Sequence, residues 1–212
     1  MSDIINQKIS ALFSKLVTLV VGTFLFNILT YGGNFSFWYS AFSDLGSTTT
    51  PQGEPNLISC LIFVAGFMIC GMVLVRISRL FNQARQIRHH RAKSQLCLLG
   101  SIGCFIFVFP HNINNDIHMI GAAMFVAALW ALGTLILIES YNQLNKEQVL
   151  LLQAVLQITV LSYAITYFAD LPVKNIAQKF ATFGLLIVLK ISTSAKIRTV
   201  FAGFSLSTNK QK

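Results

Sequence analysis

The chain has 212 residues, of which 54% are hydrophobic and only 11% are charged. A soluble domain usually carries about a quarter charged residues, so the composition excludes that class and indicates an integral membrane protein. The net charge of +9 comes from basic residues that lie between apolar runs, which indicates membrane topology and not the binding of nucleic acid.

Six apolar runs follow one another along the chain, and a bilayer core of about 30 Å needs about 20 such residues. The runs are 12–31, 57–75, 96–109, 117–138, 149–168 and 176–191. The third is short and the sixth contains Lys179. We predict an all-α, polytopic membrane protein: a six-transmembrane-helix bundle in one domain, residues 1–204, with a polar tail at 205–212.

The basic residues are distributed unevenly between the two sides of this predicted bundle. Fourteen of the sixteen Lys and Arg residues fall on the side of the two termini, and only Lys174 and Lys179 fall on the other. The positive-inside rule therefore predicts that both termini are cytoplasmic. The protein is expected to be a multi-pass membrane protein, in the plasma membrane if its source is prokaryotic.

Four cysteines lie in or beside apolar runs, and no two of them form a C-x-x-C pair. They are Cys60, Cys70, Cys97 and Cys104. Buried free thiols behave as small hydrophobic groups, so we expect no disulfide framework.

Polar residues that suit a site gather on the predicted outer side. The candidates are Ser43, Asp44, Gly46, His111, Asp116 and His118. An imidazole near the membrane needs a polar partner, and we expect Asp44 to be the partner of His118. The chain around these residues holds small groups that let helices approach closely, because Gly121 and Ala122 share a helix face with His118.

Local signals predict the ends of several elements. Gly46 is expected to adopt a positive φ after the capping residues Ser43 and Asp44. Asn56 is a candidate N-cap for the second span, and Asp116 for the fourth.

Two further patterns predict contacts between spans. Gln153 and Gln157 share a face of the fifth span and are expected to form interhelical hydrogen bonds. Alanines recur every four residues in the fourth span, at Ala123, Ala127 and Ala131, which predicts a helix-packing seam.

Several of these motifs together resemble a known family. They are Ser43-Asp44-Leu45-Gly46 with a Pro-rich turn after it, Gly100 and Gly103 in the third span, and His118-x-x-Gly121-Ala122 with Phe125. The pattern resembles the DRAM/Frag-type six-helix membrane proteins and related prokaryotic families of unknown function. Eukaryotic relatives usually carry an acidic residue after the loop proline, where this chain has Asn56. The resemblance implies a six-span fold and a link to lipid homeostasis, autophagy regulation or lipid-anchor remodelling, without an established reaction.

A metal-dependent lipid hydrolase is the catalytic alternative. Zinc binds His and carboxylate side chains and keeps one position open for water, and Asp44, His111, Asp116 and His118 are potential ligands. The chain lacks an H-x-x-x-H or H-E-x-x-H pair, so we predict no metal site and no catalytic residues.

A basic stretch follows the second span. Its cationic residues are Arg76, Arg79, Arg85, Arg88, Arg91 and Lys93. Such clusters bind anionic lipid headgroups, although the same charges also serve topology alone. The adjacent His89 and His90 point in different directions on a helix, which does not favour a metal site.

The sequence thus predicts a DRAM/Frag-like membrane protein, more in keeping with a binding protein than an enzyme. We expect it to bind or redistribute membrane lipid through a polar pocket on its outer face, with no cofactor and no nucleic-acid partner. A metal-dependent hydrolase and a non-catalytic membrane scaffold are the alternatives.

Overall fold

The computed structural model describes residues 2–141 and 145–194, which form six α-helices and one short 3-10 helix. The elements are α1 (Ser2–Thr30), η1 (Phe42–Gly46), α2 (Leu57–Gln83), α3 (His90–Phe107), α4 (Asn115–Ser140), α5 (Lys146–Phe168) and α6 (Lys174–Ser192). Across these two ranges there is no β-strand, only an isolated bridge between Thr49 and Pro55. The predicted all-α class is confirmed. The predicted tail at 205–212 lies outside the described residues.

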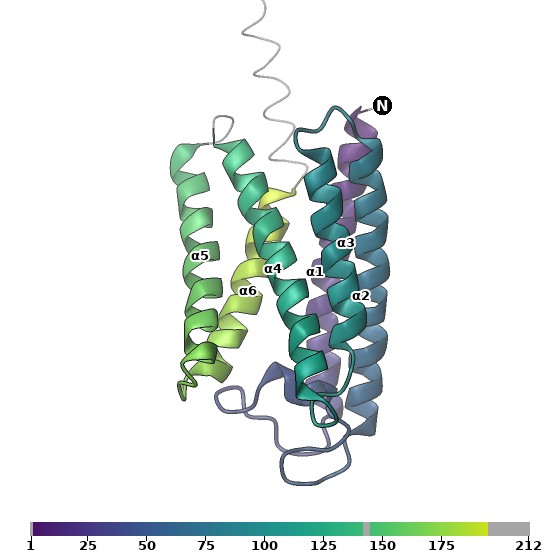
Figure 1. Cartoon of the computed structure of the whole chain (residues 1–212), viewed down its shortest axis with the longest axis vertical. Helices are drawn as coiled ribbons and strands as arrows, with labels where there is room; N and C mark the ends of the chain where they lie inside the picture. The colour runs from purple at the N-terminus through teal and green to yellow at the C-terminus, as the bar shows by residue number, and fades with distance from the viewer. Residues whose placement is uncertain (1, 142–144, 195–212) are drawn as a thin grey trace, which may run out of the picture.

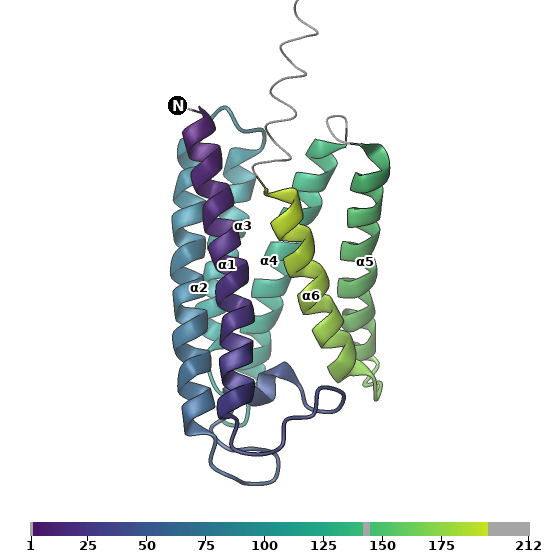
Figure 2. The same ribbon diagram turned by 180° about the vertical axis from the view of Figure 1, so that it is seen from behind.

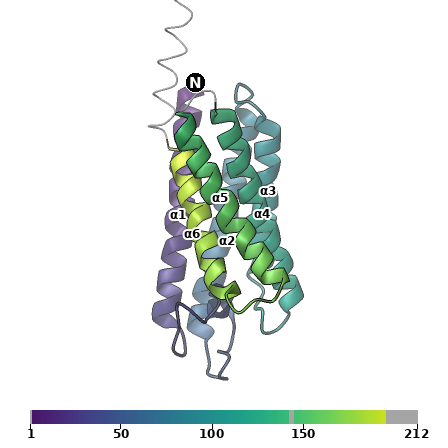
Figure 3. The same ribbon diagram turned by 90° about the vertical axis from the view of Figure 1, so that its left-hand side faces the viewer.

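The helices run up and down as a bundle, and consecutive helices are neighbours (Figure 1). Helices α1 to α4 form one sector, while α5 and α6 form a hairpin beside it (Figure 2). Helix α6 lies between α5 and the other sector, where it contacts α1 and α4 (Figure 3). We call the end that carries residues 31–56 the loop end. The opposite end carries the N-terminus and the 84–89 turn, and we call it the basic end.

Five of the described helices are long and apolar enough to cross a membrane, namely α1, α2, α4, α5 and α6. This is compatible with a multi-pass integral membrane protein. Helix α3 falls outside that group because its first turns are polar. Its apolar part begins near Leu96, and twelve residues rise only about 18 Å.

Helix α2 extends further than its apolar run predicts. It continues from the end of that run at residue 75 to Gln83, so Arg76 and Arg79 lie on a helix and not in the predicted loop. The reason is visible in the sequence, since Ile77 and Phe81 continue the helical period and are fully buried. Arg91 and Lys93 likewise lie on α3.

The core near the loop end is built from aromatic rings. Phe67 contacts Phe24, Phe63, Phe107 and Phe125, with ring centroids between 4.6 and 5.9 Å apart. The contacts with Phe24, Phe107 and Phe125 are edge-to-face, a geometry that adds about 0.5–1.5 kcal/mol per pair beyond area burial in soluble proteins. Four elements of the larger sector are thereby joined around one side chain.

The four cysteines are free and buried, as predicted.

Two glycines set the close approach of α3 and α4. A Cβ atom on Gly121 would lie 2.2 Å from the backbone N of Phe107, and one on Gly103 would lie 2.5 Å from the backbone N of Phe125. Because the obstructing atoms belong to backbone, no side-chain movement relieves the clash. The predicted role of Gly121 in helix approach is confirmed.

Candidate functional site

Asp44 lies in η1, where its carboxylate has two separate partners. One oxygen, Oδ2, accepts a hydrogen bond from the backbone N–H of Ala41 at 2.8 Å. The other, Oδ1, lies 3.2 Å from Nε2 of His111. The first contact closes the 3-10 turn, and the second joins the loop between α1 and α2 to the turn between α3 and α4.

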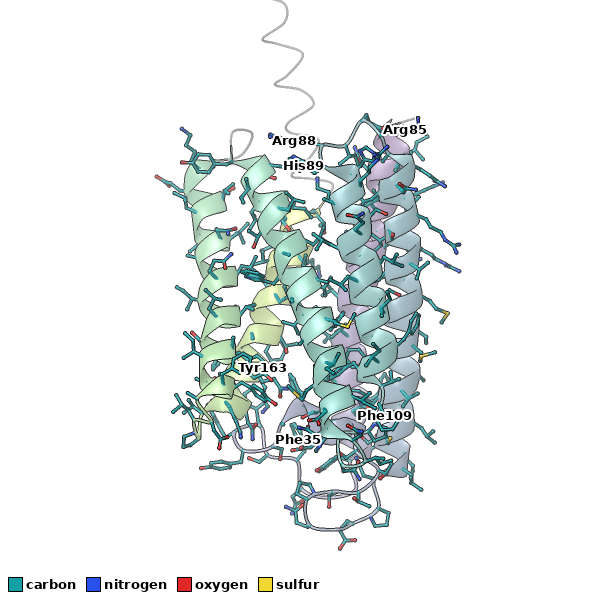
Figure 4. All side chains as sticks on the ribbon, viewed as in Figure 1. Phe35, Arg85, Arg88, His89, Phe109 and Tyr163 are labelled. Carbon is teal, nitrogen blue, oxygen red and sulfur yellow. The ribbon has the colours of Figure 1, made fainter. Side chains whose placement is uncertain are left out.

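His118 lies one turn into α4 and is only 1% exposed. Its Nδ1 lies 2.8 Å from the carbonyl oxygen of Phe109. A carbonyl only accepts, so Nδ1 carries the proton and the neutral ring keeps its lone pair on Nε2. That buried Nε2 has no hydrogen-bond partner among the described residues. Phe109 lies at the loop end, near the junction of α3 and α4 (Figure 4).

The predicted pairing of Asp44 with His118 is wrong, because His111 takes that place. The His111 ring nevertheless lies beside the His118 ring, with centroids 5.7 Å apart. Asp44, His111 and His118 therefore form one chain of neighbours, which we call the polar layer. Burial of His118 behind Phe107, at 4.5 Å between ring centroids, keeps it from the loop carboxylate.

The other predicted site residues lie apart from the polar layer or serve the backbone. Gly46 does not adopt a positive φ; a Cβ there would lie 2.8 Å from the Phe63 ring, so glycine is needed for space. Asp116 is exposed in the first turn of α4, which is capped instead by the side chain of Asn114 accepting from the backbone N–H of Ile117. Ser43 is half-buried in η1.

The polar layer does not have the geometry of a metal centre. No group of three or more His, Cys, Asp or Glu residues in the described ranges is placed to hold a metal ion.

Asn56 organises the loop end, a role that sequence reasoning missed. Its side chain makes no helix-capping hydrogen bond to α2. Instead its Oδ1 accepts from the backbone N–H of Gly32 at 3.0 Å, and its Nδ2 donates to the carbonyl of Ser47 at 2.9 Å. Asn56 is 1% exposed. Its amide supplies the hydrogen bonds that the backbone groups of Gly32 and Ser47 would otherwise need from water. The prediction that the Asn56 side chain caps α2 is therefore wrong, and the side chain instead joins two parts of the loop.

Lys179 was also missed as a structural centre. It is 1% exposed on α6, and its ammonium donates to the carbonyl of Asn175 at 3.0 Å and to that of Ser40. The rings of Phe35, Phe37 and Phe42 surround it at 5.3 to 5.8 Å. Aromatic faces attract a cation in this range, so the lysine fastens the loop end to α6. Figure 4 shows Phe35 at that end of the bundle.

A cavity of about 540 Å³ lies between α4 on one side and the α5–α6 hairpin on the other. Its walls are almost entirely apolar. They include Phe42, Phe107, Phe125, Trp130, Leu185 and Leu186. The cavity is partly open, and its exposed lining residues Ile120, Leu161 and Phe168 mark where it reaches the surface.

Hydrogen bonds hold the cavity at both ends. At one end, Trp130 Nε1 donates a hydrogen bond to Gln157 Oε1 at 2.9 Å, and Gln157 Nε2 donates one to the hydroxyl of Thr134. These two bonds join α5 to α4, so the interhelical hydrogen bonds predicted for Gln157 are confirmed. At the loop end, Gln178 accepts from the backbone N–H of Phe42 at 2.9 Å and lies 3.4 Å from the hydroxyl of Tyr163.

The predicted helix-packing seam is wrong for two of its three alanines. Ala123 and Ala127 are exposed and line the cavity.

The basic end places the predicted cationic residues in different settings. Arg85 and Arg88 lie in the turn between α2 and α3, and Arg88 lies beside His89 (Figure 4). Lys93 is 3% exposed and bonds to Glu139 of α4, whose other oxygen lies 2.7 Å from Nδ1 of His89. Its ammonium thus lies inside the bundle, away from the surface where lipid headgroups bind.

Comparison with known proteins adds no relative to this picture. No protein-family model, curated protein or solved structure matches the chain.

Proposed function

We propose that all six helices span the bilayer, with both termini in the cytoplasm. The distribution of Lys and Arg supports this orientation. Helix α3 packs against both α2 and α4, and Lys93 in its polar first turns is buried and paired with Glu139, so that charge is shielded from lipid. The loop end is then the outer end of the protein.

We propose further that the protein binds a membrane lipid, with an acyl chain in the cavity between α4 and the α5–α6 hairpin. The observation that carries this proposal is the cavity itself. Its volume of about 540 Å³ lies within the range of small-molecule sites, and its apolar walls suit a hydrocarbon. Along α4 its lining extends from Met119 to Trp130, about 16 Å, which is about half of the bilayer core. A chain from one leaflet fits that depth.

The polar layer lies where the headgroup of such a lipid is expected. Phe107 lines the cavity and packs against His118, while Phe42 lines it from the same short helix that carries Asp44. His118 is buried behind Phe107 and does not line the cavity, so the partly exposed Asp44 and His111 are the groups of the polar layer that a headgroup can reach. This arrangement supports a lipid-binding protein, in which lipid enters sideways between α4 and α5.

Filling the cavity tests the proposal. In a Trp38→Phe background, Trp130 is the one remaining tryptophan, and it lies in the cavity wall. Titrating the detergent-purified protein with a phospholipid that carries brominated acyl chains is expected to quench Trp130 fluorescence saturably. The double substitution Ala123→Phe and Ala127→Phe is expected to abolish the saturable component.

Ala154→Phe is the matched control, because Ala154 is an exposed alanine on α5 that does not line the cavity. It is expected to leave the quenching unchanged. Quenching that rises without saturation in all three proteins would mean that lipid only dissolves around the bundle, and the proposal would fail.

Two substitutions at Asp44 separate its structural role from its role in binding. Asp44→Ala leaves the backbone N–H of Ala41 without its acceptor, which is expected to lower stability by about 1 kcal/mol. Asp44→Asn keeps an acceptor for Ala41 but removes the charge beside His111. We expect it to melt close to the wild-type temperature and to change the headgroup preference in the same quenching titration. Unchanged preference among lipids of different headgroup would remove Asp44 from the binding site.

A further inference from the structure

A second hollow lies at the basic end, on the outside of the bundle where α1 and α2 pack together. It has a volume of about 410 Å³. Its walls come from two stripes of side chains, one on each helix. They are Lys8, Ala11, Leu12 and Lys15 on α1, and Arg76, Arg79, Leu80 and Gln83 on α2. We call this hollow the basic groove.

The basic groove brings together four positively charged side chains. Its four cationic residues, Lys8, Lys15, Arg76 and Arg79, are all exposed. None of the four takes part in an ion pair within the described ranges, and no acidic residue lines the groove. Elsewhere at this end the cation Lys93 is paired with a carboxylate. The groove is therefore a concave site for an anion, with Leu12 and Leu80 as an apolar floor.

The spacing of the cations places them at two depths. Lys8 and Lys15 are seven residues apart, so they share one face of α1 and lie about 10 Å apart along its axis. Arg76 directly follows the apolar run of α2, and Arg79 lies about one turn further out. Because the two helices are antiparallel, Lys15 and Arg76 lie nearer the hydrocarbon than Lys8 and Arg79. In the proposed topology, Lys15 and Arg76 would lie near the lipid phosphates, which basic side chains reach by extending toward the interface.

We propose that the basic groove binds the phosphate headgroup of an anionic phospholipid from the leaflet at the basic end. Its acyl chains would lie along the lipid-facing sides of α1 and α2. This site is separate from the cavity between α4 and the α5–α6 hairpin, because the two share no lining residue. The ligand is a membrane lipid and not a soluble phosphate, because the groove has an apolar floor and its inner cations border the apolar runs.

Native mass spectrometry of the full-length protein in detergent tests this proposal. The protein is titrated with phosphatidylglycerol, with phosphatidylcholine of the same acyl chains, and with inorganic phosphate. We expect phosphatidylglycerol to bind most tightly. The double substitution Lys15→Gln and Arg76→Gln is expected to weaken it about 30-fold, since each basic residue near a membrane surface contributes about 1 kcal/mol, or about fivefold.

The matched control removes two charges from the same end. Arg85→Gln and Arg88→Gln alter the exposed turn outside the groove and are expected to change binding by no more than a few fold. All four positions are exposed, so both variants should melt like the wild type. Lys8→Gln with Arg79→Gln provides a second groove variant if the first pair melts at a lower temperature.

Three results would overturn the proposal. Equal losses in the groove and control variants would mean that only net charge matters. Equal binding of phosphatidylglycerol and phosphatidylcholine would mean that the groove does not recognise the charge of the headgroup. Binding of inorganic phosphate as tight as that of phosphatidylglycerol would make the groove a site for a soluble anion. The cavity variants serve to separate the two sites, because Ala123→Phe with Ala127→Phe is expected to leave binding in the basic groove unchanged.

Discussion

Gly121→Ala is expected to destabilise the protein by about 2 kcal/mol, at the centre of the range for an overpacked core. The added Cβ would lie 2.2 Å from the backbone N of Phe107, so α3 and α4 must separate along their whole contact. Gly103→Ala, with its clash of 2.5 Å against the backbone of Phe125, is expected to behave alike. Thermal unfolding in detergent, followed by loss of the monodisperse species, measures both effects.

Gly100 and Gly22 provide controls within the same structure. A Cβ on Gly100 would meet its nearest neighbours at 3.4 and 3.5 Å, and one on Gly22 would meet nothing within 4 Å. Alanine at either position is expected to change stability by less than about 0.5 kcal/mol or to stabilise the helix. If Gly100→Ala were as harmful as Gly121→Ala, the close contact would not be the cause.

Glu139→Ala is expected to be still more damaging, with a loss of about 3 kcal/mol. Glu139 bonds to the buried ammonium of Lys93 and lies 2.7 Å from Nδ1 of His89. Removing the carboxylate takes the Glu139 partner away from a lysine inside the bundle, and it also removes an ion pair between α3 and α4 at the basic end. The melting temperature in detergent and the yield of membrane-inserted protein are both expected to fall.

The double substitution Lys93→Met and Glu139→Leu tests the electrostatic origin of this loss. Replacing both partners of a buried ion pair by apolar groups is often neutral or stabilising, so the double variant should melt well above Glu139→Ala alone. Glu147→Ala is the matched control, because Glu147 is an exposed acid in the first turn of α5. A double variant as unstable as Glu139→Ala would show that packing, and not charge, explains the effect.

The helices were largely predictable because each apolar run is bounded by polar or turn residues. The end of α2 was missed although its signal was present: Ile77, Leu80 and Phe81 continue the helical period after the first arginine. Hydropathy alone places a boundary at the first charge, whereas an amphipathic helix end carries its charges on one face only. The same reading concealed the basic groove, because its cations come from two helices that are far apart in the sequence.

The residues of the candidate site were predictable from the sequence, but the contacts between them were not. The sequence places Asp44, His111 and His118 at one end of the bundle. Their partners depend on the fold of a long loop, which is set by side chains such as Asn56 that bond to several backbone groups at once. The cavity was beyond prediction, since the small residues that line it, Ala123 among them, are the same residues that elsewhere let helices touch.

The buried environment of Lys179 has a consequence for the order in which the helices assemble. Helix α6 has the lowest mean hydropathy of the five long apolar helices, and it carries a lysine whose partners, Ser40 and the three phenylalanine rings, lie in the loop after α1. In the topology proposed above, that loop is synthesised and translocated before α6 emerges. We therefore expect α6 to insert stably only after the loop has folded around the position of the Lys179 ammonium, so that insertion of the α5–α6 hairpin would depend on correct assembly of the N-terminal part.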